Sequence, residues 1–386
     1  LLGGIFADKL LGYRNAVVLG ALIMALGHGS LALEGIEQNF FYLGLGLLVI
    51  GNGLFKPNIS SIVGQLYKAD DPRKDGAYTI FYMGINAGAF LGILLCGYLG
   101  EKVGWHYGFG LAGIFMFFGM LQFYFAQGIF GSIGVKPTNK SNTSNSKEDT
   151  VKVSADANHK KIERDRIFVI VIFSIATIFF WWAFEQAGGS MTIFANDYTD
   201  RQLSGNSAVI FNTINTVITI VPMVVITYVL IKLFQNIFQS YFISNFFLGL
   251  SFVIIWGIVI YMLNAEIGQE TSEIPASWFS VLNSLFIILL APVFSKIWAS
   301  KYNPSGPIKF GIGLILLGVG YLFIAYGSLG IPAGAQTASV SVMWLVYAYL
   351  FHTLGELCLS PVGLSYVSKL APERLIAVSY THLRAH

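Results

Sequence analysis

Long, almost uninterrupted apolar segments dominate the sequence, and they limit the chain to one kind of fold. A helix that crosses a lipid bilayer needs about 20 mostly apolar residues. Ten segments of the 386-residue chain meet that need, at about 16–33, 40–66, 77–99, 107–130, 166–187, 208–233, 242–263, 278–299, 308–327 and 342–366. Only 11% of the residues are charged, against about 25% in soluble domains. The sequence therefore predicts an all-α, polytopic transmembrane helix bundle embedded in a lipid bilayer.

The loops between these segments carry basic residues unequally. Lys and Arg concentrate on the cytoplasmic side of a membrane. If the loop at 7–15 is cytoplasmic and the loops alternate, only Lys102 and Arg201 fall outside. The inner loops then hold Lys9, Arg14, Lys68, Arg73, Lys74, the basic residues of 131–165, Lys232, Lys296, Lys301, Lys309, Lys369 and Arg374. This split supports the helix count, because one missed helix would reverse every later loop. The small net charge of +3 gives no reason to expect a nucleic-acid partner.

One polar stretch divides the helices. Residues 131–165 are rich in Ser, Asn, Lys and Asp and cannot bury a core, which indicates a flexible cytoplasmic linker. It separates a first helical half, 1–130, from a second, 166–375, and two such halves are a common plan among transporters. The last residues, 376–386, are short and polar, and we expect this tail to lie outside the fold as translated adapter, vector or assembly sequence.

Three ionisable residues, Lys56, Glu185 and Glu356, lie deep in apolar segments. Each costs about 2.5–3.5 kcal/mol near the bilayer centre on insertion scales, so such residues face a cavity, a partner charge or a substrate. Pro57 follows Lys56 directly, and a proline kinks a helix and frees a backbone carbonyl. Three charges beside helix breakers, on three separate helices, favour a shared polar cavity over isolated structural ion pairs.

Other polar residues leave alternatives open. Asn86 and Asn283 each either bond a neighbouring helix or line the cavity. His352 lies one turn before Glu356, but this pair alone is a weak indication of a metal site. Cys96 and Cys358 lie in apolar segments and are typical of packing thiols. No nucleophile, base and orienting group gather in one region, so we expect no enzyme activity, no metal and no cofactor.

Five motifs, in order, resemble the proton-coupled oligopeptide transporter (POT, or PTR) family of the major facilitator superfamily. They are "GGIFADKLLGYRN", "GNGLFKPNISSIVGQLY", "DGAYTIFYMGINAGAFLG", "FWWAFEQAGGSMTIFA" and "GELCLSPVGLSYVSKLAP". The first is similar to the superfamily loop between helices 2 and 3, with Gly4, Asp8, Lys9, Gly12 and Arg14 at its motif positions. The others resemble helices 4, 5, 7 and 10, and the resemblance covers about residues 1–375 apart from one insertion.

The resemblance implies a function and roles for single residues. It implies proton-coupled symport of di- and tripeptides across the inner (plasma) membrane by alternating access. Lys56 is expected to meet the peptide carboxylate and Glu356 its amino end, while Glu185, with Lys56, takes part in proton coupling. The remaining implied pocket residues are Tyr82, Asn86, Trp181, Phe184 and Asn283. It implies nothing about the oligomeric state.

The chain also departs from the family pattern. We expect it to be truncated at both ends, without helices 1, 11 and 12, most of helix 2, and the first-helix ExxER motif. Two extra apolar helices, within about 207–264, follow the seventh helix, and we expect them to pack peripherally on lipid without contacting substrate. Rival functions are transport of nitrate or another organic anion by the same fold and, less favoured, a peptide-sensing receptor. Glu356 argues against a purely anionic cargo, because it would repel one.

Overall fold

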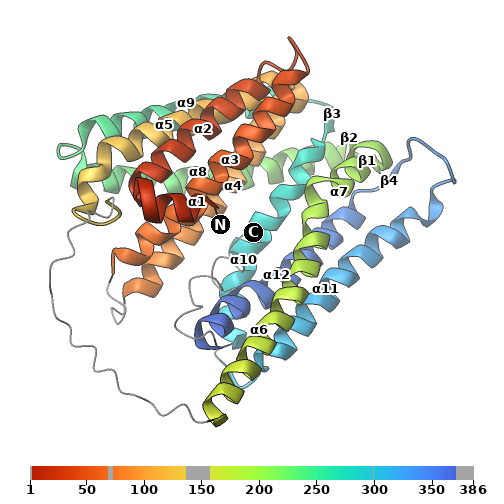
Figure 1. Ribbon diagram of the computed structural model, residues 1–386. Coiled ribbons are helices and arrows are strands. Elements are labelled where there is room, and N and C mark those ends of the chain that lie inside the picture. Colours follow the sequence, from red (N-terminus) through yellow and green to blue (C-terminus); the bar gives the residue numbers. More distant parts are fainter. Residues whose placement is uncertain (1, 68–72, 136–156, 299, 371–386) are drawn as a thin grey trace. The chain divides into compact units, whose positions relative to one another are not determined.

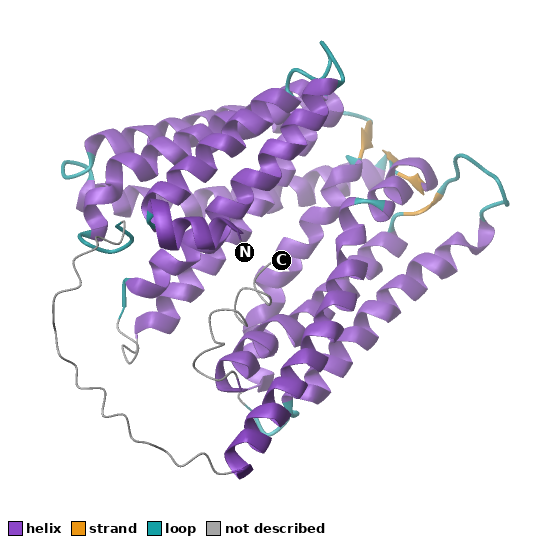
Figure 2. Cartoon of the chain, in the orientation of Figure 1, coloured by secondary structure: helices purple, strands orange, loops and turns teal. Residues whose placement is uncertain are grey.

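The structure is a computed structural model that describes residues 2–67, 73–135, 157–298 and 300–370, with some side chains in these ranges left out. Nearly every described residue is helical, and the strands are very short (Figure 2). The main helices are α1 (Leu2–Phe6), α2 (Tyr13–Leu31), α3 (Asn39–Gln65), α4 (Arg73–Lys102), α5 (Trp105–Ala126), α6 (Ala157–Phe184), α7 (Ser190–Ile193), α8 (Asn206–Ile237), α9 (Phe242–Glu266), α10 (Val281–Trp298), α11 (Gly306–Gly327) and α12 (Met343–Leu370) (Figure 1).

The predicted membrane spans are confirmed as helices. In the described part of the chain, 9 helical stretches are long and apolar enough to cross a membrane. The tenth expected span, at about 342–366, corresponds to α12, whose described apolar part is Met343–Leu359. Apolar side chains on these helices remain exposed in large numbers, as expected of surfaces that contact lipid.

The chain divides into two compact units. Unit 1 comprises residues 1–136, 195–284 and 336–342, and unit 2 comprises 137–194, 285–335 and 343–386. Two small sheets lie in unit 1. Strand β1 (Thr199–Asp200) pairs in parallel with β4 (Val340–Ser341), and β2 (Gln202–Ser204) pairs antiparallel with β3 (Thr271–Glu273). These sheets join the loops that precede α8, α10 and α12.

In unit 1, glycines bring α2 and α3 into close contact. Gly20 on α2 lies opposite Gly51 on α3, and one heptad along each helix Gly27 lies opposite Gly44. A Cβ atom added to Gly20 would lie 2.7 Å from the Gly51 carbonyl oxygen, and one added to Gly51 would lie 2.8 Å from the Gly20 carbonyl oxygen. Small residues at helix interfaces let backbones approach in this way inside membranes, where hydrophobic burial gives little driving force.

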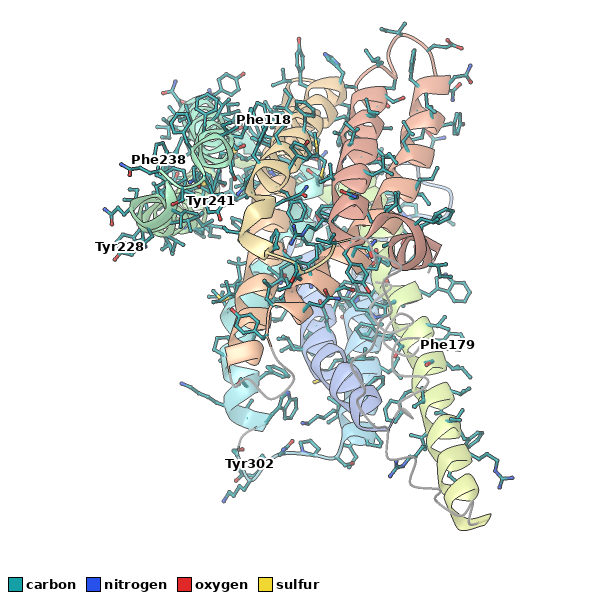
Figure 3. The ribbon with its side chains drawn as sticks, turned by 60° about the vertical axis from the view of Figure 1, so that its left-hand side comes forward. Phe118, Phe179, Tyr228, Phe238, Tyr241 and Tyr302 are labelled. Atoms are coloured by element: carbon teal, nitrogen blue, oxygen red, sulfur yellow. The ribbon has the colours of Figure 1, made fainter. Side chains whose placement is uncertain are left out.

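The helix pair α8–α9, which follows the seventh family-like helix, belongs to unit 1. Helix α9 packs along α5, and Phe118 of α5 lies 5.7 Å, ring to ring, from Phe247 of α9. Figure 3 shows Phe238 and Tyr241 at the turn between the two helices and Tyr228 on α8. The inner side of the pair shares a buried apolar cluster with α4, made of Phe90, Leu91, Leu94, Leu95, Tyr98, Leu111, Met223, Val259, Met262, Leu263, Trp278 and Val281. The pair therefore has a well-packed inner side as well as an exposed one.

In unit 2, α6 packs against α11 and α12 (Figure 1). The core residues are Phe173, Phe180, Phe310, Leu317 and Leu359. Glycines spaced by seven residues on α11 face α12: Gly313 lies at Gly355, Gly320 at His352 and Gly327 at Trp344. The close approach of α11 and α12 therefore depends on the three glycines of α11, which have no side chain and recur every seven residues.

The helix α6 begins earlier than its apolar segment suggests. It starts at Ala157, inside the stretch 131–165 that the sequence indicates to be a linker. Residues 158–166 read "NHKKIERDR" and include several strong helix formers with oppositely charged residues three and four positions apart. Most of the predicted linker, 136–156, lies outside the described residues.

Candidate functional site

Lys56 lies on α3 at a proline kink. Pro57 is inside α3, so the carbonyl of Gly53, four residues earlier, loses its helical hydrogen-bond donor. That carbonyl packs against Gly3 of α1, where any Cβ atom would collide with it. The freed carbonyl therefore meets another helix, and Lys56 itself is exposed on α3 beside Pro57.

Asn58 is a buried polar residue that the sequence reasoning did not single out. It is 1% exposed, and its Nδ2 donates to the carbonyl oxygens of Leu54, at 2.6 Å, and Gly3, at 3.4 Å. The amide therefore joins α1 to α3 within one turn of Lys56. Its position directly after "KP" was the available signal, because backbone groups next to a kink need side-chain partners.

The other predicted residues of unit 1 lie on α4 and α10. Asn86 is buried on α4, and Asn283 is half-buried near the start of α10. Tyr82 is a residue of α4, and only its backbone is described. Asn86 and Asn283 both make polar or ring contacts. For each of them, bonding to a neighbouring helix and lining of the cavity stay open as alternatives.

In unit 2, Glu185 marks a change of helix type. Helix α6 ends at Phe184, and Glu185 is the first residue of the 3₁₀ turn η3 (Glu185–Gly188). The Glu185 side chain is exposed. Trp181 and Phe184 form an edge-to-face pair with ring centroids 5.1 Å apart, on the side of α6 that packs on the core of unit 2. The two aromatic residues predicted to line the pocket are thus in mutual contact beside the glutamate.

Glu356 is buried on α12, at 8% exposed, and it makes a polar interaction. His352, one turn earlier, is 1% exposed and lies near the Phe184 ring, with centroids 6.3 Å apart. Among the described residues, no group of three His, Cys, Asp or Glu side chains is placed to hold a metal ion.

The loop motif forms the turn between α1 and α2. A π-helical turn (Ala7–Leu11) ends at Gly12, whose φ of 75° favours glycine, and α2 begins at the next residue. Arg14 donates from Nε to the Ile133 carbonyl oxygen at 2.5 Å and from Nη2 to the Gly131 carbonyl oxygen at 2.6 Å. Arg14 thus fixes the chain after α5. The motif also includes Gly4, half-buried on α1, and Asp8 and Lys9, whose side chains lie outside the described part.

A charged cluster in unit 1 was not predicted. Glu101, at the end of α4, accepts backbone N–H bonds from Ala276 at 2.7 Å and Ser277 at 2.8 Å. Arg201 lies 3.8 Å from Glu101 and 3.0 Å from Glu273, and it donates to the Ile274 carbonyl oxygen at 2.7 Å. The signal for it was present, because Lys102 and Arg201 are the two basic residues assigned to outer loops.

Long apolar helices define a multi-pass membrane protein, and the ionisable residues Lys56, Glu185 and Glu356 on three of its elements are typical of a solute transporter. The particular family follows from comparison with known proteins. The chain belongs to the POT family, whose sequence profile (PTR2) matches residues 14–148 and 251–383. The stretch between the two matches contains α6, the turn with Glu185, α7 and α8, and the second match extends into the tail 376–386.

Several known proteins are similar over nearly the whole chain. The peptide transporter YePEPT of Yersinia enterocolitica is 33% identical, over 97% of this chain and 71% of its own length. The di-/tripeptide transporter of Lactococcus lactis subsp. cremoris is 32% identical, over 96% of this chain and 71% of its own length. Among solved structures, a peptide transporter POT in complex with sulfate is 27% identical, with a TM-score of 0.67. The match covers 99% of this chain and 73% of the chain in that structure. A POT family transporter in complex with 5-aminolevulinic acid is 26% identical with a TM-score of 0.68, covering 99% and 74%.

Proposed function

We propose that this protein is a secondary active transporter that imports di- and tripeptides together with protons by alternating access. The observation that carries the proposal is that a POT family chain keeps Lys56 beside the α3 kink, Glu185 at the helix break, and a buried Glu356. Relatives named as peptide transporters at 32–33% identity support the same cargo. The function is transport without enzymatic chemistry.

The charges suit a zwitterionic peptide. The ends of an extended di- or tripeptide lie about 6–10 Å apart, at about 3.3–3.6 Å per residue. In the proposal, Lys56 binds the carboxylate and Glu356 the ammonium group, while Tyr82, Asn86 and Asn283 add polar contacts. Trp181 and Phe184 supply apolar surface that accepts different peptide side chains. We therefore expect broad selectivity for the side chains and strict selectivity for the two free ends.

Proton coupling is proposed to act through Glu185 and Lys56. Protonation of a carboxylate removes a charge and so breaks any ion pair that it makes, which biases one conformational state against another. An inward proton gradient then drives uptake. We propose that the protein lies in the inner (plasma) membrane with the 131–165 stretch in the cytoplasm, and the basic residues of the inner loops support this orientation.

The test is uptake of labelled dialanine by the full-length protein in proteoliposomes under an inward proton gradient. Wild type is compared with Lys56→Ala and Glu356→Gln, and Lys102→Ala is the matched control because this lysine belongs to an outer loop. We expect gradient-dependent uptake in wild type and the control, and its loss in the other two variants. Uptake that persists in Lys56→Ala and Glu356→Gln contradicts the proposed roles.

The same assay separates the rival functions. Gradient-driven uptake of nitrate without uptake of dialanine means an anion transporter. Binding of peptide without uptake means a receptor, and release of free alanine inside or outside the vesicles means an enzyme. Each of these results contradicts peptide symport.

A further inference from the structure

The helix break at Glu185 exposes backbone carbonyls that need partners. A change from α-helix to 3₁₀ turn interrupts the regular bonding pattern, and in a membrane each unbonded backbone group costs several kcal/mol by general estimates. Here α6 ends at Phe184, the turn η3 runs to Gly188, and Gly189 separates it from α7. The carbonyls of Ala183 and Ala187 flank Glu185 on its two sides.

Two tyrosines from neighbouring helices donate to these carbonyls. Tyr321 of α11 donates its hydroxyl to the Ala183 carbonyl oxygen at 2.5 Å. Tyr349 of α12 is 2% exposed and donates to the Ala187 carbonyl oxygen at 3.4 Å. Ala187 also accepts the hydroxyl of Thr192, at 2.8 Å. Side chains of α11 and α12 therefore bond the backbone two residues before and two residues after Glu185.

His352 lies close to both tyrosines. Its ring centroid is 4.6 Å from that of Tyr321 and 6.5 Å from that of Tyr349, and the side chain is buried. Gly320 makes room for it, because a Cβ atom there would lie 2.7 Å from the His352 Nε2 atom. In the described part of the chain neither ring nitrogen has a hydrogen-bond partner. The imidazole ring of His352 is therefore positioned by packing against Tyr321 and Gly320 of α11, while His352 and Tyr349 are both part of α12.

The opposite side of α6 faces away from these contacts. Phe179 and Trp182 are 58% and 67% exposed, and Figure 3 shows Phe179 projecting from α6 away from α11 and α12. Phe180, by contrast, is fully buried against Phe184, with ring centroids 5.7 Å apart. The end of α6 is thus oriented by its inner face, where the two tyrosines and His352 lie.

We propose that Tyr321, Tyr349 and His352 form a positioning cluster that fixes the helix break at Glu185 and so sets how strongly transport depends on the proton gradient. The cluster acts through the backbone of residues 183–187. The effect of the cluster on transport rests on the proposed function, whereas its effect on the backbone of residues 183–187 is independent of that function.

The first test is Tyr321→Phe, which keeps the ring and removes only the hydroxyl that binds Ala183. Tyr326→Phe is the matched control, because Tyr326 lies on the same helix and is 65% exposed. Hydrogen exchange of the amides of 184–193 is measured in the full-length protein. Loss of one buried hydrogen bond predicts about three- to tenfold faster exchange there in Tyr321→Phe and no change in the control. Unchanged exchange in Tyr321→Phe overturns the proposal.

The second test separates positioning from general destabilisation. Equilibrium binding of dialanine and gradient-driven uptake are measured per folded molecule for wild type, Tyr321→Phe and His352→Ala. We expect binding within about twofold of wild type and gradient-driven uptake reduced by about three- to tenfold in both variants. Parallel loss of binding and uptake, or no loss of either, overturns the proposal. If wild type takes up no peptide, the proposed function fails, while the exchange experiment still tests the cluster.

Discussion

Removing the Glu101 carboxylate should loosen the start of α10. The carboxylate accepts the N–H groups of Ala276 and Ser277, which belong to the 3₁₀ turn that leads into α10. Such N–H groups at the start of a helix have no partner within the helix itself. Glu101 therefore acts as a cap supplied by another helix, and its side chain is only 16% exposed.

The size of the effect follows from the two bonds. A hydrogen bond to a charged group contributes about 1.5–3 kcal/mol, and water reaching the freed N–H groups favours the lower end of that range. For Glu101→Ala we expect about 3 kcal/mol less stability against local opening, or about 100-fold faster amide exchange at these two residues. Glu101→Gln retains a neutral acceptor and should increase exchange by about tenfold.

Hydrogen exchange of the 274–280 segment measures the change directly. Lys102→Ala is the control, because it removes only a neighbouring ion pair with Glu273, at 3.1 Å between partly exposed side chains. Such pairs contribute about 0–1 kcal/mol, so exchange at Ala276 and Ser277 should change little. If Glu101→Ala and Lys102→Ala have the same effect, the capping role of Glu101 is refuted.

Two further predictions concern packing and the loop motif. Gly51→Ala should destabilise the protein by about 1–3 kcal/mol, because the added methyl group meets the Gly20 carbonyl. The control Gly84→Ala has open space within 4 Å and should be neutral or slightly stabilising, and thermal unfolding in detergent distinguishes the two. Arg14→Ala should speed limited proteolysis after α5, because it removes both hydrogen bonds to Gly131 and Ile133. Proteolysis at the wild-type rate would count against an anchoring role for Arg14.

Sequence patterns predicted the spans because a membrane imposes one strong condition on them, a run of about 20 apolar residues. The unbonded carbonyl of Gly53 was equally predictable, since Pro57 lacks the backbone N–H that would donate to it. The start of α6 was not predictable from the apolar segments, because the first turns of this helix are charged. These residues favour a helix by their intrinsic propensity but do not form part of an apolar run. Each of these outcomes depends on local sequence alone.

The partners of the break at Glu185 could not be predicted in the same way. Tyr321 and Tyr349 are two aromatics among many in apolar helices, and only packing shows which hydroxyl reaches a carbonyl. Glu101 likewise binds Ala276 across 175 residues of sequence. His352 was noticed beside Glu356, but its relation to Tyr321 depends on the glycine opposite it, Gly320.

The glycine pairs have a consequence for how the protein moves. Where Gly20 meets Gly51, and where Gly313 meets Gly355, main-chain atoms of the two helices lie opposite each other, with side chains such as Met24 and Leu359 packed alongside. Contacts of this kind leave little room to slide or tilt by repacking rotamers, so we expect α2 to move together with α3, and α11 together with α12. We then expect bending during a transport cycle to concentrate at helix breaks outside these glycine contacts, of which the turn at Glu185 after α6 is one.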